Sequence, residues 1–217
     1  MAAAVAAIRV RDARLRMQDR MEKEKVHFQM QVLRSQVNPH FLFNSFNTLI
    51  ELIEHSPDKA VKHVEQLSDF FREILQVRDK ELIPLRDELR LVDTYFFLEQ
   101  RRFGDRIALL TNASQGALRA LVPPLTVQLL VENALKHNQA SDAQPLTVTI
   151  SATNEQLTVS NPLRPREPML KSTGFGIDSI RQRFAALTDR PVSFAAEGDH
   201  FTATVPLIAP NHEDPDR

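Results

Sequence analysis

The stretch that decides the fold is residues 36–44, which read QVNPHFLFN. Pro39 interrupts a long helical pattern, and a proline inside a helix removes a backbone donor and kinks it. His40 follows the kink and Asn44 comes four residues later, so the two side chains share one helix face. An imidazole in this place could act as a nucleophile, with the amide positioning a water or a phosphoryl group. A buried or capping histidine in an aromatic cluster explains the stretch equally well.

A helical hairpin is predicted around a turn that follows this stretch. The apolar pattern continues from Phe41 to Ile53, and residues 56–58, Ser-Pro-Asp, are a turn signal. The second helix carries a heptad seam formed by Ala60, Val64, Leu67, Phe71 and Ile74. Each helix has an apolar face too broad for one partner helix. Two hairpins are therefore expected to form a four-helix bundle in a parallel homodimer.

An α/β layer is predicted after the hairpin. Pro84 stands where a third helix can begin, and that helix is expected to end at 102–104. Beyond it, β-branched residues mark short strands at 106–111, 146–152, 157–160, 192–195 and 201–207. Helical patterns occupy residues 124–137 and 177–187. Helices and strands mixed in this way indicate an antiparallel or mixed sheet covered by helices.

The composition of the 217-residue chain is that of a globular protein, with 42% hydrophobic and 25% charged residues. The net charge of -1 creates no field that attracts nucleic acid or an anionic membrane. Because cysteine is absent, disulfides and thiolate metal sites are excluded, and 5 glycines are too few for a Gly-rich Rossmann or P-loop fingerprint. The apolar run at 2–8 is far shorter than the ~20 residues of a membrane span. It is either the end of a span that lies upstream or an Ala-rich helix start.

A second candidate site is residues 129–138, which read LLVENALKHN. Asn133, Lys136 and His137 lie three and four residues apart, toward the C-terminal end of an apolar helix. An amide oxygen together with phosphates is a suitable cage for magnesium, and lysine supplies a point charge for phosphate. The alternative is an amphipathic core helix whose polar end is merely solvated.

A third candidate site is residues 172–177, which read STGFGI and lead directly into a helix. Gly174 and Gly176 fall at this junction, where backbone amides bind phosphate well. An ordinary turn at the start of a helix is the more common source of such a pattern.

Taken together, these segments resemble the LytS-type sensor histidine kinases, over residues 31–207. Residues 36–44 are similar to that family's phospho-acceptor box, and 131–137 to its nucleotide-binding asparagine box. Residues 84–106 resemble its linker helix, and 174–183 its second glycine box. The resemblance implies an α+β fold, in which a dimerising helical hairpin precedes an α/β sandwich domain of the Bergerat ATPase type.

On this resemblance the chain is expected to have five segments. They are a helical or coiled-coil linker at 1–30, a dimerisation and histidine phosphotransfer hairpin at 31–80, a linker helix at 81–104, an ATP-binding catalytic domain at 105–210 and a tail at 211–217. Dimerisation and nucleotide binding are thus assigned to different parts of the chain.

The resemblance also implies the chemistry. His40 attacks the γ-phosphate of ATP with Asn44 beside it, and the phosphoryl group then passes to an aspartate of a response regulator. Asn133 holds Mg²⁺, with Glu132 as a second candidate ligand. The other expected contacts to ATP come from Lys136, His137, Asn161, Gly174 and Gly176. Family members often pair with regulators that carry LytTR DNA-binding domains, so a regulator of this type is one candidate partner.

The expected setting follows from the same resemblance. The chain is expected to be a cytoplasmic homodimer that signals through the receiver domain of its regulator and does not touch nucleic acid itself. Attachment to the inner membrane is expected only through a segment upstream of the chain.

The chain departs from the family at the adenine end of the expected site. The first glycine box, Asp-x-Gly-x-Gly in most relatives, is missing, and Asn161 stands in place of its adenine-binding aspartate. An asparagine can accept from the adenine amino group and donate to the neighbouring ring nitrogen. Alternatively, Asn161 is only a turn former before Pro162. A further departure is Phe41, which follows His40 where many histidine kinases have an acidic base.

Two other functions remain open in the sequence. One is a non-catalytic dimeric scaffold, or a pseudokinase with weak ATP binding, which keeps the fold and loses the chemistry. The other is an ATPase that uses the nucleotide fold to drive a conformational change. An ATPase does not need a histidine on a helical hairpin, so His40 weighs against it.

Overall fold

The structure, a computed structural model, describes residues 39–166 and 175–210. At the helix ends Pro39, His40 and Phe175, it describes the backbone alone. The predictions for the N-terminal linker, the kink before Pro39, Gly174 and the tail from residue 211 lie outside the described residues.

The chain divides into two compact units, residues 1–47 and 48–217, and the boundary falls inside the first described helix. Each unit is described by itself. The finer division into five segments stays a prediction. In the part of the chain that the structure describes, no helix has both the length and the apolar character that a membrane span needs.

The predicted hairpin helices are α2 (Pro39–His55) and α3 (Pro57–Val77), and they meet at Ser56 as the turn signal indicated. Pro57 stands in the first turn of α3, where the missing backbone N–H has no helical partner to lose. One stripe of α3 is buried within the chain: Ala60, His63, Leu67, Phe70 and Ile74.

This stripe differs from the predicted heptad seam at two positions. Val64 is 43% exposed and Phe71 is half-buried, whereas His63 and Phe70 take the buried places. The reason is that α3 packs on α4 (Leu85–Phe103) within the same chain, where the rings of Phe70 and Tyr95 lie 5.9 Å apart. The apolar face of α3 is wider than this contact, so its flank stays exposed.

Helix α4 is the predicted third helix, and it begins directly after Pro84. A two-stranded antiparallel ribbon of β1 (Ile83–Pro84) and β3 (Leu121–Val122) fixes its start. It ends at Gly104, whose φ of 63° lies in the region that favours glycine. The two short 3₁₀ turns of this region are η1 (Gly104–Arg106) and η2 (Ala117–Arg119).

The sheet is mixed, as the sequence predicted, with the strand order β2-β4-β5-β7-β6. Its strands are β2 (Ile107–Ala113), β4 (Leu146–Ala152), β5 (Gln156–Pro162), β6 (Ser193–Glu197) and β7 (His200–Pro206). β2 and β4 are parallel, and the other neighbours are antiparallel. Each of the five predicted strands is therefore present.

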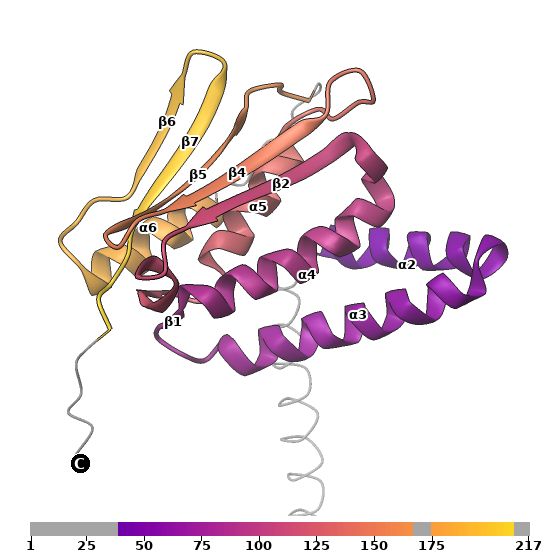
Figure 1. Cartoon of the computed structure of the whole chain (residues 1–217), viewed down its shortest axis with the longest axis horizontal. Coiled ribbons are helices and arrows are strands. Elements are labelled where there is room, and N and C mark those ends of the chain that lie inside the picture. The colour runs from indigo at the N-terminus through magenta and orange to yellow at the C-terminus, as the bar shows by residue number, and fades with distance from the viewer. Residues whose placement is uncertain (1–38, 167–174, 211–217) are drawn as a thin grey trace, which may run out of the picture. The chain divides into compact units, whose positions relative to one another are not determined.

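Helices α4, α5 (Thr126–His137) and α6 (Phe175–Leu187) lie along one face of this sheet (Figure 1). Side chains alternate between the two faces of each strand. The face toward the helices carries the apolar core: Leu146, Val148, Ile150, Leu157, Val159 and Val205. The opposite face carries half-buried threonines: Thr147, Thr149, Thr158 and Thr204.

Candidate functional site

The candidate site is built on α5, and a side chain from α4 fixes where α5 begins. Helix α5 follows Leu125, whose backbone has a φ of 64°. The carboxylate of Glu88 accepts hydrogen bonds from the backbone N–H groups of Leu125 at 2.8 Å, Val127 at 2.8 Å and Gln128 at 3.2 Å. These are N–H groups that a helix leaves without partners at its N-terminus. Glu88 therefore caps α5 and ties it to α4.

Glu88 is completely buried, and burial raises the pKa of its carboxyl group to about 7. The three backbone hydrogen bonds and the charge of Arg183 oppose this rise. Arg183 comes from α6 and donates from Nη1 to the carbonyl oxygen of Pro124 at 2.9 Å. Helices α4, α5 and α6 thus converge on the turn before α5.

Two turns further along α5, the Asn133 side chain faces the first residues of α6. A Cβ atom on Gly176 would lie 3.3 Å from Asn133 Nδ2, closer than most such contacts, so glycine leaves room for the amide. Asn133 Nδ2 is buried and has no hydrogen-bond partner among the described residues. An unsatisfied buried donor costs free energy. The asparagine box and the second glycine box therefore meet at an amide that can take a ligand.

The C-terminal end of α5 is basic. Lys136 is exposed and His137 is half-buried. Burial lowers the pKa of His137, and the charges of Lys136 and Arg166 lower it further. The imidazole is therefore held toward its neutral form near pH 7.

The chain that leaves β5 is fastened to this end of α5. Asn138 donates from Nδ2 to Ala134 O at 2.9 Å and accepts at Oδ1 from Arg164 N at 2.8 Å. Arg166 donates from its backbone N–H to His137 O at 3.1 Å and from Nε to Asn138 O at 2.7 Å. Arg166 is a residue that the sequence reasoning missed. The basic pair Arg164 and Arg166 in the segment after β5 was the signal that could have found it.

Asn161 lies on the helix-facing side of β5, together with Leu157 and Val159. It is only 2% exposed, and its Nδ2 donates to the carbonyl oxygen of Pro162 at 2.8 Å. The amide oxygen and the second N–H of Nδ2 are then the groups left to contact a ligand. Among the predicted site residues, Asn161 is the one that belongs to the sheet.

The structure thus brings together part of the predicted site. Asn133 and Gly176 are adjacent, and Lys136 and His137 share the end of α5. Glu132 is half-buried and accepts from Gln128 Nε2 at 3.2 Å. No group of three or more His, Cys, Asp or Glu side chains suited to a metal occurs in the described residues.

The predicted catalytic pair lies in the other unit. His40 is the second residue of α2, and its side chain lies outside the described residues. Asn44 lies one turn later in the same helix and is half-buried. Their shared face stays a prediction.

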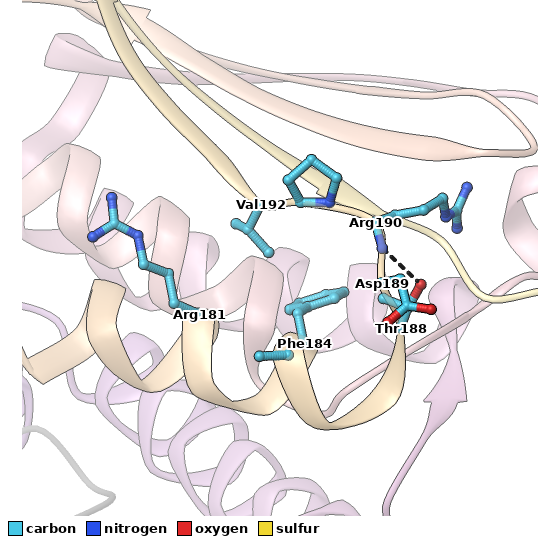
Figure 2. A pocket seen from close by; sticks show the side chains of 8 residues that line it. Arg181, Phe184, Thr188, Asp189, Arg190 and Val192 are labelled. Atoms are coloured by element: carbon cyan, nitrogen blue, oxygen red, sulfur yellow. Dashed lines mark hydrogen bonds between the residues drawn. The ribbon is translucent and has the colours of Figure 1, made fainter.

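A separate pocket of about 300 Å³ lies at the C-terminal end of α6 (Figure 2). Phe184 and Val192 line it beside charged side chains, and the backbone N–H of Arg190 donates to Thr188 Oγ1 at 3.2 Å. The Arg190 guanidinium donates to the carbonyl oxygens of Glu155, at 3.0 Å, and of Leu207. This arginine joins the α6–β6 connection to the sheet. None of the predicted site residues lines this pocket.

Comparison with known proteins gives one family. Residues 28–107 match the histidine kinase family. The sensor protein LytS of Staphylococcus haemolyticus is 33% identical over 196 residues, which cover 83% of this chain and 34% of that protein. The sensor histidine kinase BtsS of Escherichia coli K12 is 33% identical over 182 residues, covering 80% of this chain and 32% of that protein.

The chain spans about one third of the length of these relatives. Among solved structures, the cytoplasmic segment of histidine kinase QseC is similar with a TM-score of 0.42 and 19% identity, covering 73% of this chain and 97% of that one. The sequence matches show that the chain belongs to the histidine kinase family, with LytS-type sensor proteins among its relatives.

Proposed function

We propose that the chain is the kinase core of a two-component sensor, which uses ATP to phosphorylate His40 and then passes the phosphoryl group to a response regulator. The observation that carries the proposal is the buried Asn133 amide, which lacks a partner for Nδ2 among the described residues and lies against Gly176. Two motifs far apart in the sequence supply these residues. A ligand between them satisfies the amide.

The nucleotide is assigned to the helix-facing side of the sheet. Asn161 contacts adenine through its amide oxygen, which can accept from the adenine amino group. Lys136 supplies positive charge for the phosphates, and neutral His137 supplies a hydrogen bond. Backbone groups around Gly174 and Gly176 complete the contacts at the start of α6.

Magnesium fits the residues of this site. Mg²⁺ binds oxygen, keeps several waters and is commonly held by one or two protein groups together with substrate phosphates. Asn133 offers such an oxygen once its amide turns by half a rotation, which exchanges oxygen and nitrogen. Glu132 is the second candidate ligand. Bound Mg²⁺ would neutralise charge that develops on the phosphates.

His40 is the proposed acceptor. A neutral imidazole nitrogen attacks the γ-phosphorus in line. The bond between the γ-phosphorus and the β–γ bridging oxygen breaks, and ADP leaves. Asn44, one helical turn later, orients the imidazole or the phosphoryl group. Phe41 supplies no base, so the imidazole proton leaves to solvent. A response-regulator aspartate then takes the phosphoryl group, and a LytTR-type regulator is the candidate partner.

A homodimer is proposed from the hairpin. Leu49, Ile53, Val61 and Val64 line an apolar groove of about 330 Å³ on α2 and α3. Ile53, Val61 and Val64 are 57%, 60% and 43% exposed, which is unusual for large apolar side chains gathered in one place. A second hairpin covers them in the four-helix bundle. Because ATP and a response regulator are both cytoplasmic, the dimer is proposed to act in the cytoplasm.

Incubation with ATP labelled on the γ-phosphate tests the function. Transfer to His40 gives label on the protein that is lost in acid, and His40→Gln should abolish it. His55→Gln is the matched control, since His55 lies in the same helix and is exposed. Free labelled phosphate without labelled protein would indicate an ATPase. The absence of both products would indicate a scaffold and would contradict the proposal.

A further inference from the structure

Two arginines of the unit 48–217 lie around one ring at the end of α4. The guanidinium carbon of Arg102 is 4.0 Å from the centre of the Phe103 ring, and that of Arg166 is 5.6 Å from it. Arg102 belongs to α4, and Arg166 follows β5. Burial lowers the pKa of Arg166, and the like charge of Arg102 lowers it further, so a nearby negative charge stabilises this arrangement.

Glu99 supplies that charge, and it forms hydrogen bonds and an ion pair with Arg102. Its Oε2 accepts from Arg102 Nη2 at 2.5 Å and from Nε at 3.2 Å. The Glu99 side chain is 4% exposed and that of Arg102 is 31% exposed. A buried carboxylate with a two-point arginine contact is a strong pair. Glu99 is therefore occupied.

The charge of Arg166 is not paired within the described residues. Its side chain makes one hydrogen bond among the described residues, from Nε to Asn138 O, and no ion pair with them. Burial lowers its pKa, as does the charge of Arg102, while Glu99 acts in the opposite direction. Its two terminal nitrogens have no acceptor among the described residues, and, in addition to burial, the Arg166 charge lowers the pKa of His137. A guanidinium fixed in this way has the geometry that phosphate oxygens match.

We propose that Arg166 binds the phosphate chain of the nucleotide, and that Arg102 is a positioning residue that keeps Arg166 available by occupying Glu99. This inference rests on the proposed ATP-binding function. Without Arg102, the Glu99 carboxylate attracts Arg166 and draws its guanidinium away from the phosphates. The two arginines thus compete for one acid, and the outcome sets how well ATP binds.

ATP and adenosine binding, measured by calorimetry, test the direct contact. Arg166→Ala should weaken ATP binding at least about tenfold, the effect of losing a hydrogen bond between charged groups. Adenosine has no phosphate, so its affinity should not change. Arg101→Ala is the control, because Arg101 is exposed on α4, next to Arg102, and faces Phe97. Unchanged ATP affinity in Arg166→Ala overturns the proposal.

The positioning role is tested by rescue. Arg102→Ala should weaken ATP binding by a similar factor, and adding Glu99→Gln should restore it, because the competing acid is then gone. If Arg102→Ala does not fold, Arg102→Lys replaces the two-point contact by one ammonium group and should lose part of the affinity. No rescue by Glu99→Gln, or unchanged affinity in Arg102→Lys, overturns this role.

The same measurements separate this inference from the proposed function. Wild-type protein that binds ATP, with variants that all bind it equally, contradicts the arginine competition alone. Wild-type protein that binds neither ATP nor adenosine contradicts the proposed function, and with it the contact assigned to Arg166.

Discussion

Helix α3 leaves Val61 and Val64 60% and 43% exposed, whereas the contact between α4 and α5 buries Glu88 completely. The first region exposes side chains that are usually buried, and the second buries a group that is usually exposed. Each departure costs free energy unless a partner removes it. The first region therefore needs an apolar surface as its partner, and the second needs hydrogen-bond donors.

The buried polar groups differ in whether their hydrogen-bond partners lie among the described residues of the chain. Glu88 has three backbone N–H partners within the chain, so its burial is explained by the fold. Asn133 Nδ2 has none among the described residues, so its burial indicates a ligand. The apolar flank of α3 indicates a protein surface.

The largest effect is expected on the hairpin. Val64→Glu should place two unpaired charges in the homodimer interface, at about 3–5 kcal/mol each, and raise the dissociation constant more than about a thousandfold. Lys62→Glu introduces the same residue at an exposed position of α3 and should leave the dimer intact. Light scattering at micromolar concentration measures both. A monomeric wild-type protein would contradict the dimer.

The choice of Val64 comes from the structure. Leu67 belongs to the predicted seam, but it is buried within the chain, so Leu67→Glu should unfold the monomer as well. Val64 is exposed, and its replacement tests association alone.

The second effect concerns Glu88 and pH. Its pKa is raised from 4.5 to about 7, so the folded protein keeps a proton that the unfolded chain loses. The stability that this proton supplies is complete below pH 4.5 and is lost as pH rises through 7, on the order of 3 kcal/mol in all. Urea unfolding at several pH values should show this dependence in wild type and not in Glu88→Gln.

The control for Glu88 is its neighbour in the same helix. Asp87 has a side chain that is 39% exposed, so Asp87→Asn should keep the pH dependence of the wild type. If Asp87→Asn and Glu88→Gln changed the pH dependence of stability equally, a group other than Glu88 would carry it.

Glu88 also marks the limit of what sequence could predict. The five strands and the main helices were found because each depends on a local pattern of apolar residues or on proline and glycine. The cap that Glu88 makes on α5 joins residues 37 to 40 positions apart, and no local pattern encodes it. Arg166 belongs to a basic pair that the sequence shows, but its place beside α5 and α4 depends on contacts that no local pattern encodes.

The motifs of the candidate site could be picked out from the sequence because their residue order is specific. It could not show that Gly176 lies against the Asn133 amide, or that α4 draws His63 and Phe70 into the core. Val64 and His63 are adjacent on α3, and a heptad pattern assigns either of them to a seam. The packing of α4 decides between them.

A third measurement examines the amide without an internal partner. Asn133→Ala should weaken magnesium-dependent ATP binding by about 30–100-fold, since an interaction with a charged group is lost. The effect should shrink when magnesium is removed. Asn112→Ala on β2 is the control, because Asn112 is exposed. Calorimetry that shows unchanged affinity in Asn133→Ala would remove the reason to assign a ligand there.

The smallest effect is expected at Asn161, where a buried amide donates one hydrogen bond within the chain and offers its oxygen as an acceptor to a ligand. Its nitrogen donates one N–H to Pro162 O, and its oxygen can accept from the adenine amino group. Guanine has a carbonyl oxygen in that position and would face the same oxygen without a donor. Asn161→Leu should therefore weaken ATP binding about tenfold, or about 1.4 kcal/mol, and reduce the preference for ATP over GTP. If Asn161 only supports the turn before Pro162, Asn161→Leu lowers stability while the preference stays the same. Competition between the two nucleotides decides this, because a preference is a ratio, and a general loss of folded protein leaves a ratio unchanged.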